Sequence, residues 1–360
     1  MSILRGLPCR TQLHVSDRGK GAATGLYHRA MSANGSRPDL RLALIGAGWI
    51  TQSHLAALDR LGRTELVGVA SARIESAEAT ARPRGVRAYD DVHRLLDDTR
   101  PDVAYVCVPP SAAVAICEQL VERGIPFLTE KPLAATDAAG PARVAGAILE
   151  RGLVVAVGYH LRALEAMTKV RQLLAHNPAR LVTARWLNDT PAPAWWRREA
   201  GGGGQVVEQA THFYDLARWL VGEAEVVGAV SVREEPVVPP GADVVDATAA
   251  LLRFETGAVG SFANTRRLAS AVVEFELASA ELITTVRRAG EGPGSFEVSF
   301  ADGAFVRTVP TGRDPYEVQA EAFLDAVESG DPDRVFSSYA DALKTDRLTR
   351  SVVAATGRPG

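Results

Sequence analysis

The chain has 360 residues, a formal net charge of −3, and 46% hydrophobic and 23% charged residues. These values are typical of a globular enzyme with about two domains, and they give no indication of binding to nucleic acid or to an anionic membrane. No apolar run approaches the roughly 18 residues that a membrane span needs. The cysteines, Cys9, Cys107 and Cys117, follow no metal or disulfide pattern. We therefore expect reduced thiols, a cytoplasmic protein and no metal site.

Residues 1–38 differ in composition from the rest of the chain. They contain a single acid, Asp17, and no apolar core of a secretory signal. A basic leader of this kind can mimic a transit peptide, but we expect a disordered extension, with Met31 as an alternative start. Its basic residues are Arg5, Arg10, Arg18, Lys20, Arg29 and Arg37.

A glycine-containing turn follows the first predicted strand, 41–45, and precedes a helical pattern at 52–61. Gly46 permits a tight turn, and Gly48 allows the backbone to approach a pyrophosphate at the helix N-terminus. This strand–turn–helix context predicts a dinucleotide site formed by Gly46, Gly48, Trp49, Ile50 and Thr51. The match is partial, because Thr51 occupies the position of the third glycine.

The end of the second predicted strand, 65–70, distinguishes the two nicotinamide cofactors. In NAD sites an acidic residue there binds the ribose 2′-hydroxyl. This chain has Ser71 and Arg73 instead, and a guanidinium can pair with a 2′-phosphate in two-pronged fashion. NADP(H) is therefore favoured over NAD(H). The alternative is a solvated Arg73, with Glu75 in the acidic role.

The alternation of strands and helices continues to residue 158. Residues 103–108 form an apolar run that is typical of a strand buried on both faces, and it ends at Pro109 and Pro110. Helices are predicted over 91–97, 112–123 and 136–151, and a strand over 153–158. We predict a Rossmann domain with a doubly wound parallel sheet over residues 39–158, and expect both prolines to line the cofactor site.

Glu130-Lys131-Pro132 follows a short apolar run, 124–129, that we interpret as another strand of this sheet. Ligands of open α/β sheets bind at the carboxyl ends of the strands. Pro132 restricts the backbone of Lys131 to extended conformations. A lone lysine after a strand is usually a solvated charge, so its importance depends on the rest of the chain.

The pattern changes in residues 159–360, where we predict an α+β domain with a large open sheet, mixed or antiparallel. Helices are expected over 161–174, 205–220, 316–329 and 339–356, the last two of which can pack back on the first domain. Strands are expected over 180–186 and, between residues 225 and 310, over 226–234, 246–254, 258–265 and 271–278. Neighbouring strands without intervening helices favour this kind of sheet.

Glu208 and His212 follow a run of four glycines, 201–204, and lie four residues apart on one predicted helix. This spacing places both side chains on one face, where a carboxylate can orient an imidazole and raise its proton affinity. His212 is thus a candidate general base for an alcohol and general acid for a ketone. The alternative is an ordinary surface pair.

Taken in this order, the motifs resemble the glucose–fructose oxidoreductase/inositol dehydrogenase/rhizopine-catabolism (Gfo/Idh/MocA) family over about residues 39–355. The anchors are Gly46-Ala-Gly48, Glu130-Lys131-Pro132, 158–162, and the glycines followed by 208–215. The resemblance implies that Lys131 and His212 match the family's catalytic lysine and histidine. It also implies a C-terminal sheet used for homodimer or homotetramer contacts.

The sequence also departs from this family's pattern. Glu208 stands where an aspartate is more usual, and His160 replaces a frequent asparagine. Val114 lies near the position of a usual histidine. These departures concern the identity of the substrate more than the cofactor or the fold.

Substrate contacts are expected at two places. Trp195, Trp196 and Arg197 precede the glycine run, where tryptophans can stack on a sugar and an arginine can bind an anionic group. The alternative is packing in the core or at a subunit interface. Tyr159, His160 and Arg162 lie at the domain junction and are further candidates. We expect His54, His93 and His176 to be structural or solvated.

These residues together predict NADP(H)-dependent hydride transfer to or from a carbinol of a sugar, sugar derivative or cyclitol. Lys131 would bind the reacting oxygen, His212 would take its proton, and Glu208 would hold His212 or a neighbouring hydroxyl. Two alternatives remain open at this point. One is transient oxidation that enables elimination, as in a lyase or glycosidase, and the other is a catalytically silent NADP-binding sensor.

Overall fold

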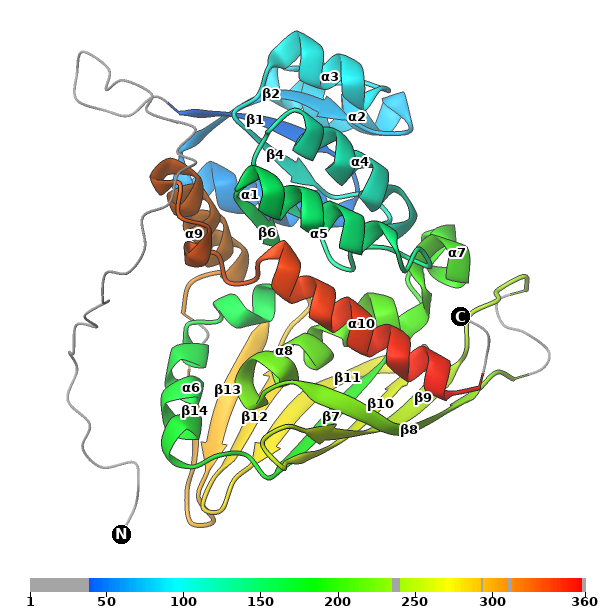
Figure 1. Ribbon diagram of the computed structural model, residues 1–360, viewed down its shortest axis with the longest axis vertical. Helices are drawn as coiled ribbons and strands as arrows, with labels where there is room; N and C mark the ends of the chain where they lie inside the picture. The colour runs from blue at the N-terminus through cyan, green and yellow to red at the C-terminus, as the bar shows by residue number, and fades with distance from the viewer. Residues whose placement is uncertain (1–38, 235–239, 293, 310–311, 358–360) are drawn as a thin grey trace.

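The computed structural model describes residues 39–234, 240–292, 294–309 and 312–357. The predictions for residues 1–38 lie outside the described residues. Two β-sheets organise the chain, one above the other in Figure 1, and helices pack on both. In the described parts of the chain, no helix is long and apolar enough to cross a membrane.

The first sheet has six strands in the order β3-β2-β1-β4-β5-β6, and every pair is parallel. This order confirms the predicted doubly wound Rossmann sheet. Its strands are β1 (Leu40–Ile45), β2 (Thr64–Ala70), β3 (Arg87–Tyr89), β4 (Val103–Val106), β5 (Phe127–Thr129) and β6 (Val155–Val157). Its helices are α1 (Trp49–Leu61), α2 (Ile74–Ala81), α3 (Val92–Thr99), α4 (Pro110–Glu122) and α5 (Gly140–Arg151), with a 3-10 turn at Arg82–Arg84.

The second sheet has eight strands in the order β14-β13-β12-β11-β7-β10-β9-β8. The pair β7–β10 is parallel and the other pairs are antiparallel, so the predicted large mixed sheet is confirmed. Its strands are β7 (Leu181–Asp189), β8 (Ala224–Val232), β9 (Ala247–Phe254), β10 (Val259–Thr265), β11 (Arg267–Ala278), β12 (Ile283–Arg288), β13 (Phe296–Ala301) and β14 (Val306–Val309).

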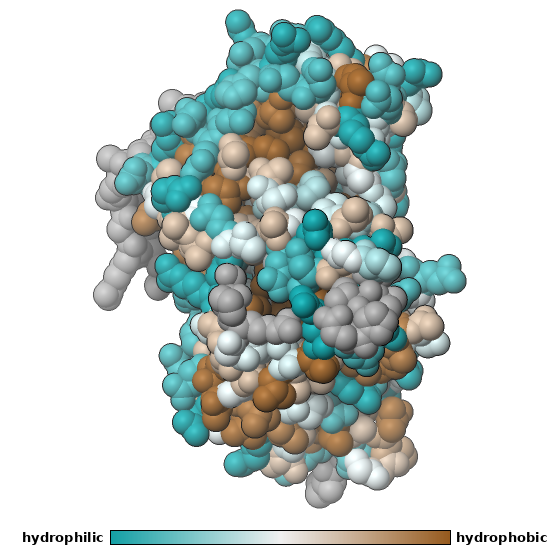
Figure 2. Space-filling view, turned by 90° about the vertical axis from the view of Figure 1, so that its right-hand side faces the viewer, coloured by the Kyte–Doolittle hydropathy of each residue, from teal (hydrophilic) through white to brown (hydrophobic). Residues whose placement is uncertain are grey.

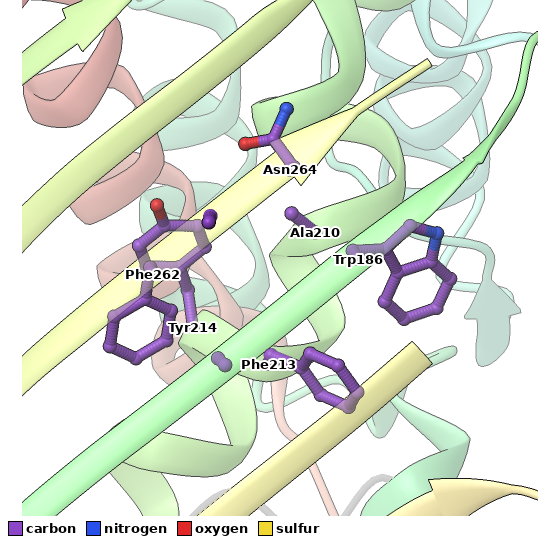
Figure 3. A pocket seen from close by; sticks show the side chains of 8 residues that line it. Trp186, Ala210, Phe213, Tyr214, Phe262 and Asn264 are labelled. Carbon is purple, nitrogen blue, oxygen red and sulfur yellow. The ribbon is translucent and has the colours of Figure 1, made fainter. Parts of the chain in front are cut away.

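One face of the second sheet is covered by helices α6 (Ala166–His176), α8 (Thr211–Val221) and α10 (Tyr339–Ala355) (Figure 1). The segment η2 (His160–Ala163) follows β6 and leads into the second part of the chain. Between β7 and α8 lie η3 (Ala194–Arg197), α7 (Glu199–Gly202) and the π-helix η4 (Val206–Ala210), and η5 (Pro332–Arg334) precedes α10. Helix α8 is held against β7 and β10 by a close hydrophobic contact that admits no water molecule (Figure 3).

The opposite face of the second sheet is exposed and carries large apolar side chains. Along β9, residues facing the helices are buried and residues facing outward are exposed. The exposed apolar residues include Leu181, Val230, Leu251, Val259 and Ile283. Figure 2 shows hydrophobic surface over the lower part of the molecule, at the level of this sheet.

Helix α9 (Pro315–Ser329) comes late in the sequence but packs on the first sheet. Phe323 contacts Tyr105 of β4 edge to face, with ring centroids 5.7 Å apart. Arg60 and Arg63, at the end of α1 and just beyond it, form ion pairs with carboxylates of α9. The Rossmann core is therefore completed by a segment from the C-terminal part of the chain.

Local structure differs from the predicted boundaries at several places. The helix predicted from residue 136 begins at Gly140, because the Asp137 carboxylate accepts the N–H groups of Ala139 and Gly140 and holds a turn. Helix α4 begins two residues earlier than predicted, with Pro110 in its first turn, where no N–H partner is required. The helix predicted over 161–174 is interrupted at Leu164, whose backbone is extended.

Candidate active site

The glycine turn after β1 is shaped to receive a phosphate. Gly46 has φ +104°, and a Cβ there would lie 2.1 Å from the carbonyl O of Cys107, so only glycine fits. Gly48 is the N-cap of α1, and a Cβ added to it would have no other atom within 4 Å. The N-terminus of α1 thus offers its N–H groups beside open space, which fits a dinucleotide pyrophosphate.

Thr51 stands at the position of the third glycine of the dinucleotide motif. Its side chain is fully buried, and its hydroxyl donates to the carbonyl O of Gly46 at 3.1 Å. The hydroxyl therefore ties the first turn of α1 to the glycine turn. Trp49, at the start of the same helix, is 56% exposed, and Ile50 is partly buried.

The residues that follow β2 and β4 lie at the carboxyl edge of the Rossmann sheet, because both strands run parallel to β1. Ser71 follows β2 and is partly buried, and Arg73 is the exposed N-cap of α2. Glu75 lies in the first turn of α2 and is also exposed. At the neighbouring strand end, Pro109 is exposed and Pro110 is buried. These positions surround the carboxyl edge of the sheet, where dinucleotides bind.

Lys131 follows β5 and connects the two parts of the chain. Its Nζ donates to Oε1 of Glu208 at 2.9 Å and to the Glu208 carbonyl O at 2.7 Å. The Lys131 side chain is 12% exposed and the Glu208 side chain 6%. The ammonium is therefore held by a carboxylate of the second sheet's layer, and it is not a solvated surface charge.

Glu208 lies in η4, the π-helix that precedes α8. We expected Glu208 to hold His212 or a neighbouring hydroxyl, whereas its carboxylate pairs with Lys131. Burial raises the pKa of Glu208 to about 7, although the Lys131 ammonium opposes this shift. Its second oxygen, Oε2, is buried without a hydrogen-bond partner among the described residues. An unpartnered buried oxygen is costly, so Oε2 is available to accept a hydrogen bond from a ligand or a water molecule.

His212 stands one turn further along, in the first turn of α8. Its ring stacks on Trp186 of β7 at 5.6 Å between centroids and meets His160 edge on at 4.7 Å. Burial lowers the pKa of His212 well below its ordinary value, and the charges of Lys131 and Arg288 act in the same direction. The imidazole is therefore neutral near pH 7, and its Nδ1 has no partner among the described residues.

His54 was expected to be structural or solvated, and the sequence interpretation missed its contact with Glu130 beside the site. It lies on α1, is 1% exposed, and its Nε2 is 2.8 Å from Oε1 of Glu130. The other oxygen of Glu130 accepts the backbone N–H of Lys131. Burial disfavours the charged Glu130, but the hydrogen bond from His54 lowers its pKa overall. The sequence does contain a signal that His54 is buried: it lies three residues after Thr51 and four before Leu58, on the same face of α1.

Tyr159, His160 and Arg162 are all buried. Tyr159 shares a hydrogen bond with Thr211, and His160 stacks on Tyr316 and contacts His212. Arg162 instead donates twice to Asp215 and pairs with Asp341. Because these carboxylates occupy its guanidinium, Arg162 has a structural role here and is not proposed as a substrate ligand.

The loop before the glycine run folds into the 3-10 helix η3. Trp195 and Trp196 stack on each other at 4.6 Å between centroids and are partly buried. Gly201 and Gly202 pack against Trp195, where a Cβ on Gly201 would lie 2.5 Å from its carbonyl O. Glycine at these positions therefore allows the backbone to pack closely against the loop that carries Trp195. Arg197 is partly buried, and its Nε has no hydrogen-bond partner among the described residues.

Comparison with known proteins places this geometry in a family. Residues 40–159 match the model of an oxidoreductase family with an NAD-binding Rossmann fold, and residues 177–306 match the Gfo/Idh/MocA C-terminal domain. The chain belongs to the Gfo/Idh/MocA oxidoreductase family. The predictions of the family and of a nicotinamide-dependent oxidoreductase are thereby confirmed.

Relatives of known function include sugar-active enzymes. The chain is 25% identical to the levoglucosan dehydrogenase of Pseudarthrobacter phenanthrenivorans, across 89% of this chain and 97% of that one. Among solved structures, a levoglucosan dehydrogenase complex with NADH and levoglucosan has a TM-score of 0.78 at 23% identity, covering 89% of this chain and 97% of that one.

A second structural neighbour is KijD10, a 3-ketoreductase from Actinomadura kijaniata in complex with NADP and TDP-benzene. Its TM-score is 0.78 at 22% identity, covering 88% of this chain and 98% of that one. At this level of identity the likeness establishes the fold. The two neighbours differ in the cofactor that they hold, so they do not decide between NAD and NADP for this chain.

Proposed function

We propose that this Gfo/Idh/MocA chain transfers a hydride between a nicotinamide cofactor and a CH–OH or carbonyl group of a sugar, sugar derivative or cyclitol. The single observation that carries the proposal is the meeting of Lys131 with Glu208, one helical turn from His212. An ammonium, a carboxyl group of raised pKa and a neutral imidazole together suit a reaction in which one proton is transferred and one oxygen develops negative charge.

The roles follow from the environments of the three side chains. Lys131 would donate a hydrogen bond to the reacting oxygen and stabilise its negative charge. His212, neutral because its pKa is lowered, would accept the hydroxyl proton in oxidation and return it in reduction. Glu208 would hold the Lys131 ammonium in place, a different role from the one that we expected from the sequence.

The cofactor, when bound, supplies the hydride chemistry itself. The chain would hold its pyrophosphate at Gly46, Gly48 and the N-terminus of α1, including Trp49, Ile50 and Thr51. Ser71 and Arg73 would meet the adenosine ribose. An exposed arginine with no acidic residue at the end of β2 favours NADP(H). Pro109, Pro110, Glu130 and Lys131 would line the remaining edge.

The substrate would bind between the strand-end residues and the start of α8. We propose His160 as a contact because it lies against His212, and Tyr159 as a support for the same ring. Trp195, Trp196 and Arg197 remain proposed contacts on a loop that packs on the glycine run. A cytoplasmic location remains a prediction from composition and cysteine usage.

We also propose that the exposed face of the second sheet joins two or four copies of the chain. Large apolar side chains are exposed on adjacent strands there, including Leu181, Leu251 and Val259. Several large apolar side chains gathered on one exposed face are typical of an interaction site.

The test combines cofactor identification with a substrate panel. Mass spectrometry of purified protein should find a nicotinamide dinucleotide, and NADP(H)-linked assays should reveal turnover of aldoses, cyclitols or their keto forms. Cofactor that stays bound and recycles without net reduction would instead indicate the lyase or glycosidase alternative. Cofactor binding with no turnover on the whole panel would indicate a sensor and contradict the proposal.

A further inference from the structure

Arg288 is an unusual cation at the rim of the candidate site. It is the last residue of β12 and lies opposite Phe296 of β13. Its guanidinium carbon is 5.4 Å from the centroid of the Trp186 ring and 5.8 Å from that of Phe296. Two aromatic rings thus fix the position of a partly buried positive charge.

Arg288 has no carboxylate partner among the described residues, and its Nε is buried without a hydrogen bond. Its neighbour Arg287 provides the contrast, because Arg287 is exposed and pairs with Glu297 across the strand. Burial lowers the pKa of Arg288, and no carboxylate among the described residues opposes this shift. A guanidinium withdrawn from water without a counter-ion is costly unless an anion binds it.

The aromatic contacts connect Arg288 to the proposed catalytic groups. Trp186 stacks on His212, and Phe296 contacts His160. The nearby carboxylates are already committed, Glu208 to Lys131 and Glu130 to His54. This side of the site therefore carries positive charge that no described residue neutralises.

We propose that Arg288 binds an anionic group of the substrate, so that the substrate is an acidic sugar derivative and not a neutral sugar. The inference rests on the oxidoreductase function proposed above. A planar guanidinium matches a carboxylate or a phosphate with two parallel hydrogen bonds. The rings of Trp186 and Phe296 would orient the guanidinium of Arg288. The CH–OH group of the substrate would lie toward His212 and Lys131.

A purely structural role makes a different prediction. If Arg288 served only to stack between two rings, its replacement would change stability but not the ranking of ligands. The experiment therefore compares ligands that differ in one charged group. One set is D-glucose, D-glucuronate and D-glucose 6-phosphate. The other is D-galactose, D-galacturonate and D-galactose 6-phosphate.

Binding to the holoenzyme is measured by calorimetry, and kcat/KM is measured by nicotinamide absorbance. We expect wild type to favour an anionic member over its neutral parent by at least about tenfold. Arg288→Gln should remove this preference, and Arg287→Gln should leave it intact. The carboxylate and phosphate members of each set then show which anion is preferred. Arg288→Lys, which keeps the charge but not the planar fork, provides the comparison if Arg288→Gln does not fold, and it should retain only part of the preference.

The outcomes separate the two proposals. Equal use of neutral and anionic sugars, or a preference that persists in Arg288→Gln or is undiminished in Arg288→Lys, overturns the role of Arg288 and leaves the oxidoreductase function standing. Failure to bind or turn over any member of the sets overturns the role of Arg288, and only failure across the whole panel of aldoses, cyclitols and keto forms, in a protein that holds its cofactor, overturns the oxidoreductase function as well.

Discussion

The Nζ atom of Lys131 lies within hydrogen-bond distance of both the side chain and the backbone carbonyl of Glu208, at 2.9 and 2.7 Å. Lys131 follows a strand of the Rossmann sheet, and Glu208 belongs to the helical layer on the second sheet. The orientation of the lysine therefore depends on both parts of the chain. A change on either side of this contact should affect turnover.

Lys131→Met should reduce kcat by at least about a hundredfold, because an ammonium that stabilises a developing oxyanion is lost. Binding of NADP(H), measured by fluorescence, should stay nearly unchanged. Lys344→Met provides a matched control, since Lys344 is an exposed residue of α10 and pairs with Glu223. Turnover of Lys131→Met within threefold of wild type would refute the assigned role.

The raised pKa of Glu208 predicts a dependence of stability on pH. The folded protein keeps this carboxyl protonated up to about pH 7, whereas the unfolded chain releases the proton near its ordinary value of 4.5. The contribution of Glu208 to folding is therefore present below 4.5 and is lost as the pH rises to 7. The unfolding free energy of wild type relative to Glu208→Gln should fall by on the order of 2 kcal/mol between pH 4.5 and 8. Denaturant unfolding at several pH values measures this difference, and a flat or rising difference would contradict it.

His54→Leu should destabilise the protein by about 3 kcal/mol, because it leaves the buried Glu130 carboxylate without its partner. Turnover should fall as well, since Glu130 accepts the backbone N–H of Lys131. His176→Leu is the control, because His176 is an exposed residue of α6. Adding Glu130→Gln to His54→Leu should recover part of the lost stability, which a double-mutant cycle can measure.

Arg73→Glu should shift cofactor preference from NADP(H) toward NAD(H) by at least about tenfold in kcat/KM, because a carboxylate repels a 2′-phosphate and accepts ribose hydroxyls. Arg82→Glu makes the same charge change just beyond the other end of α2, where the side chain is 82% exposed, and should not alter the preference. A wild-type enzyme that prefers NAD(H) would contradict the interpretation of Ser71 and Arg73.

The double change Val230→Asp and Leu251→Asp should lower the oligomeric state, because it places charge on the exposed apolar face of the second sheet. Sedimentation velocity measures the mass of the particle in solution. Leu149→Asp is the control, since Leu149 is 82% exposed on α5, away from that sheet. A wild type that sediments as a monomer would exclude the proposed assembly.

The local patterns in the sequence were sufficient to predict the Rossmann sheet, the mixed second sheet and the motifs that carry Lys131, Glu208 and His212. Each depends on residues close in sequence, such as the apolar run of β4 or the glycines around residue 46. The contact between Lys131 and Glu208 joins residues 77 positions apart. The sequence led us to pair Glu208 with His212 or a neighbouring hydroxyl, and the contact with Lys131 became visible only in the folded chain.

Other site residues left no local signal. Arg288 ends an ordinary strand, and its lack of a counter-ion depends on which carboxylates the fold brings near it. Arg162 was expected to contact substrate because it follows the domain junction, yet Asp215 and Asp341 meet its guanidinium from two different helices. Long-range partners of this kind decide whether a charged residue is structural or available to a ligand.

Helix α9 has a consequence for how this protein is made. It packs Phe323, Leu324 and Ala320 into the core of the Rossmann sheet, although more than 150 residues separate it from the last strand of that sheet. During synthesis the apolar surface of the first sheet stays uncovered until α9, residues 315–329, has been made. A fragment that stops after β6 would expose this surface and aggregate, so a minimal cofactor-binding domain needs α9 attached by a redesigned linker.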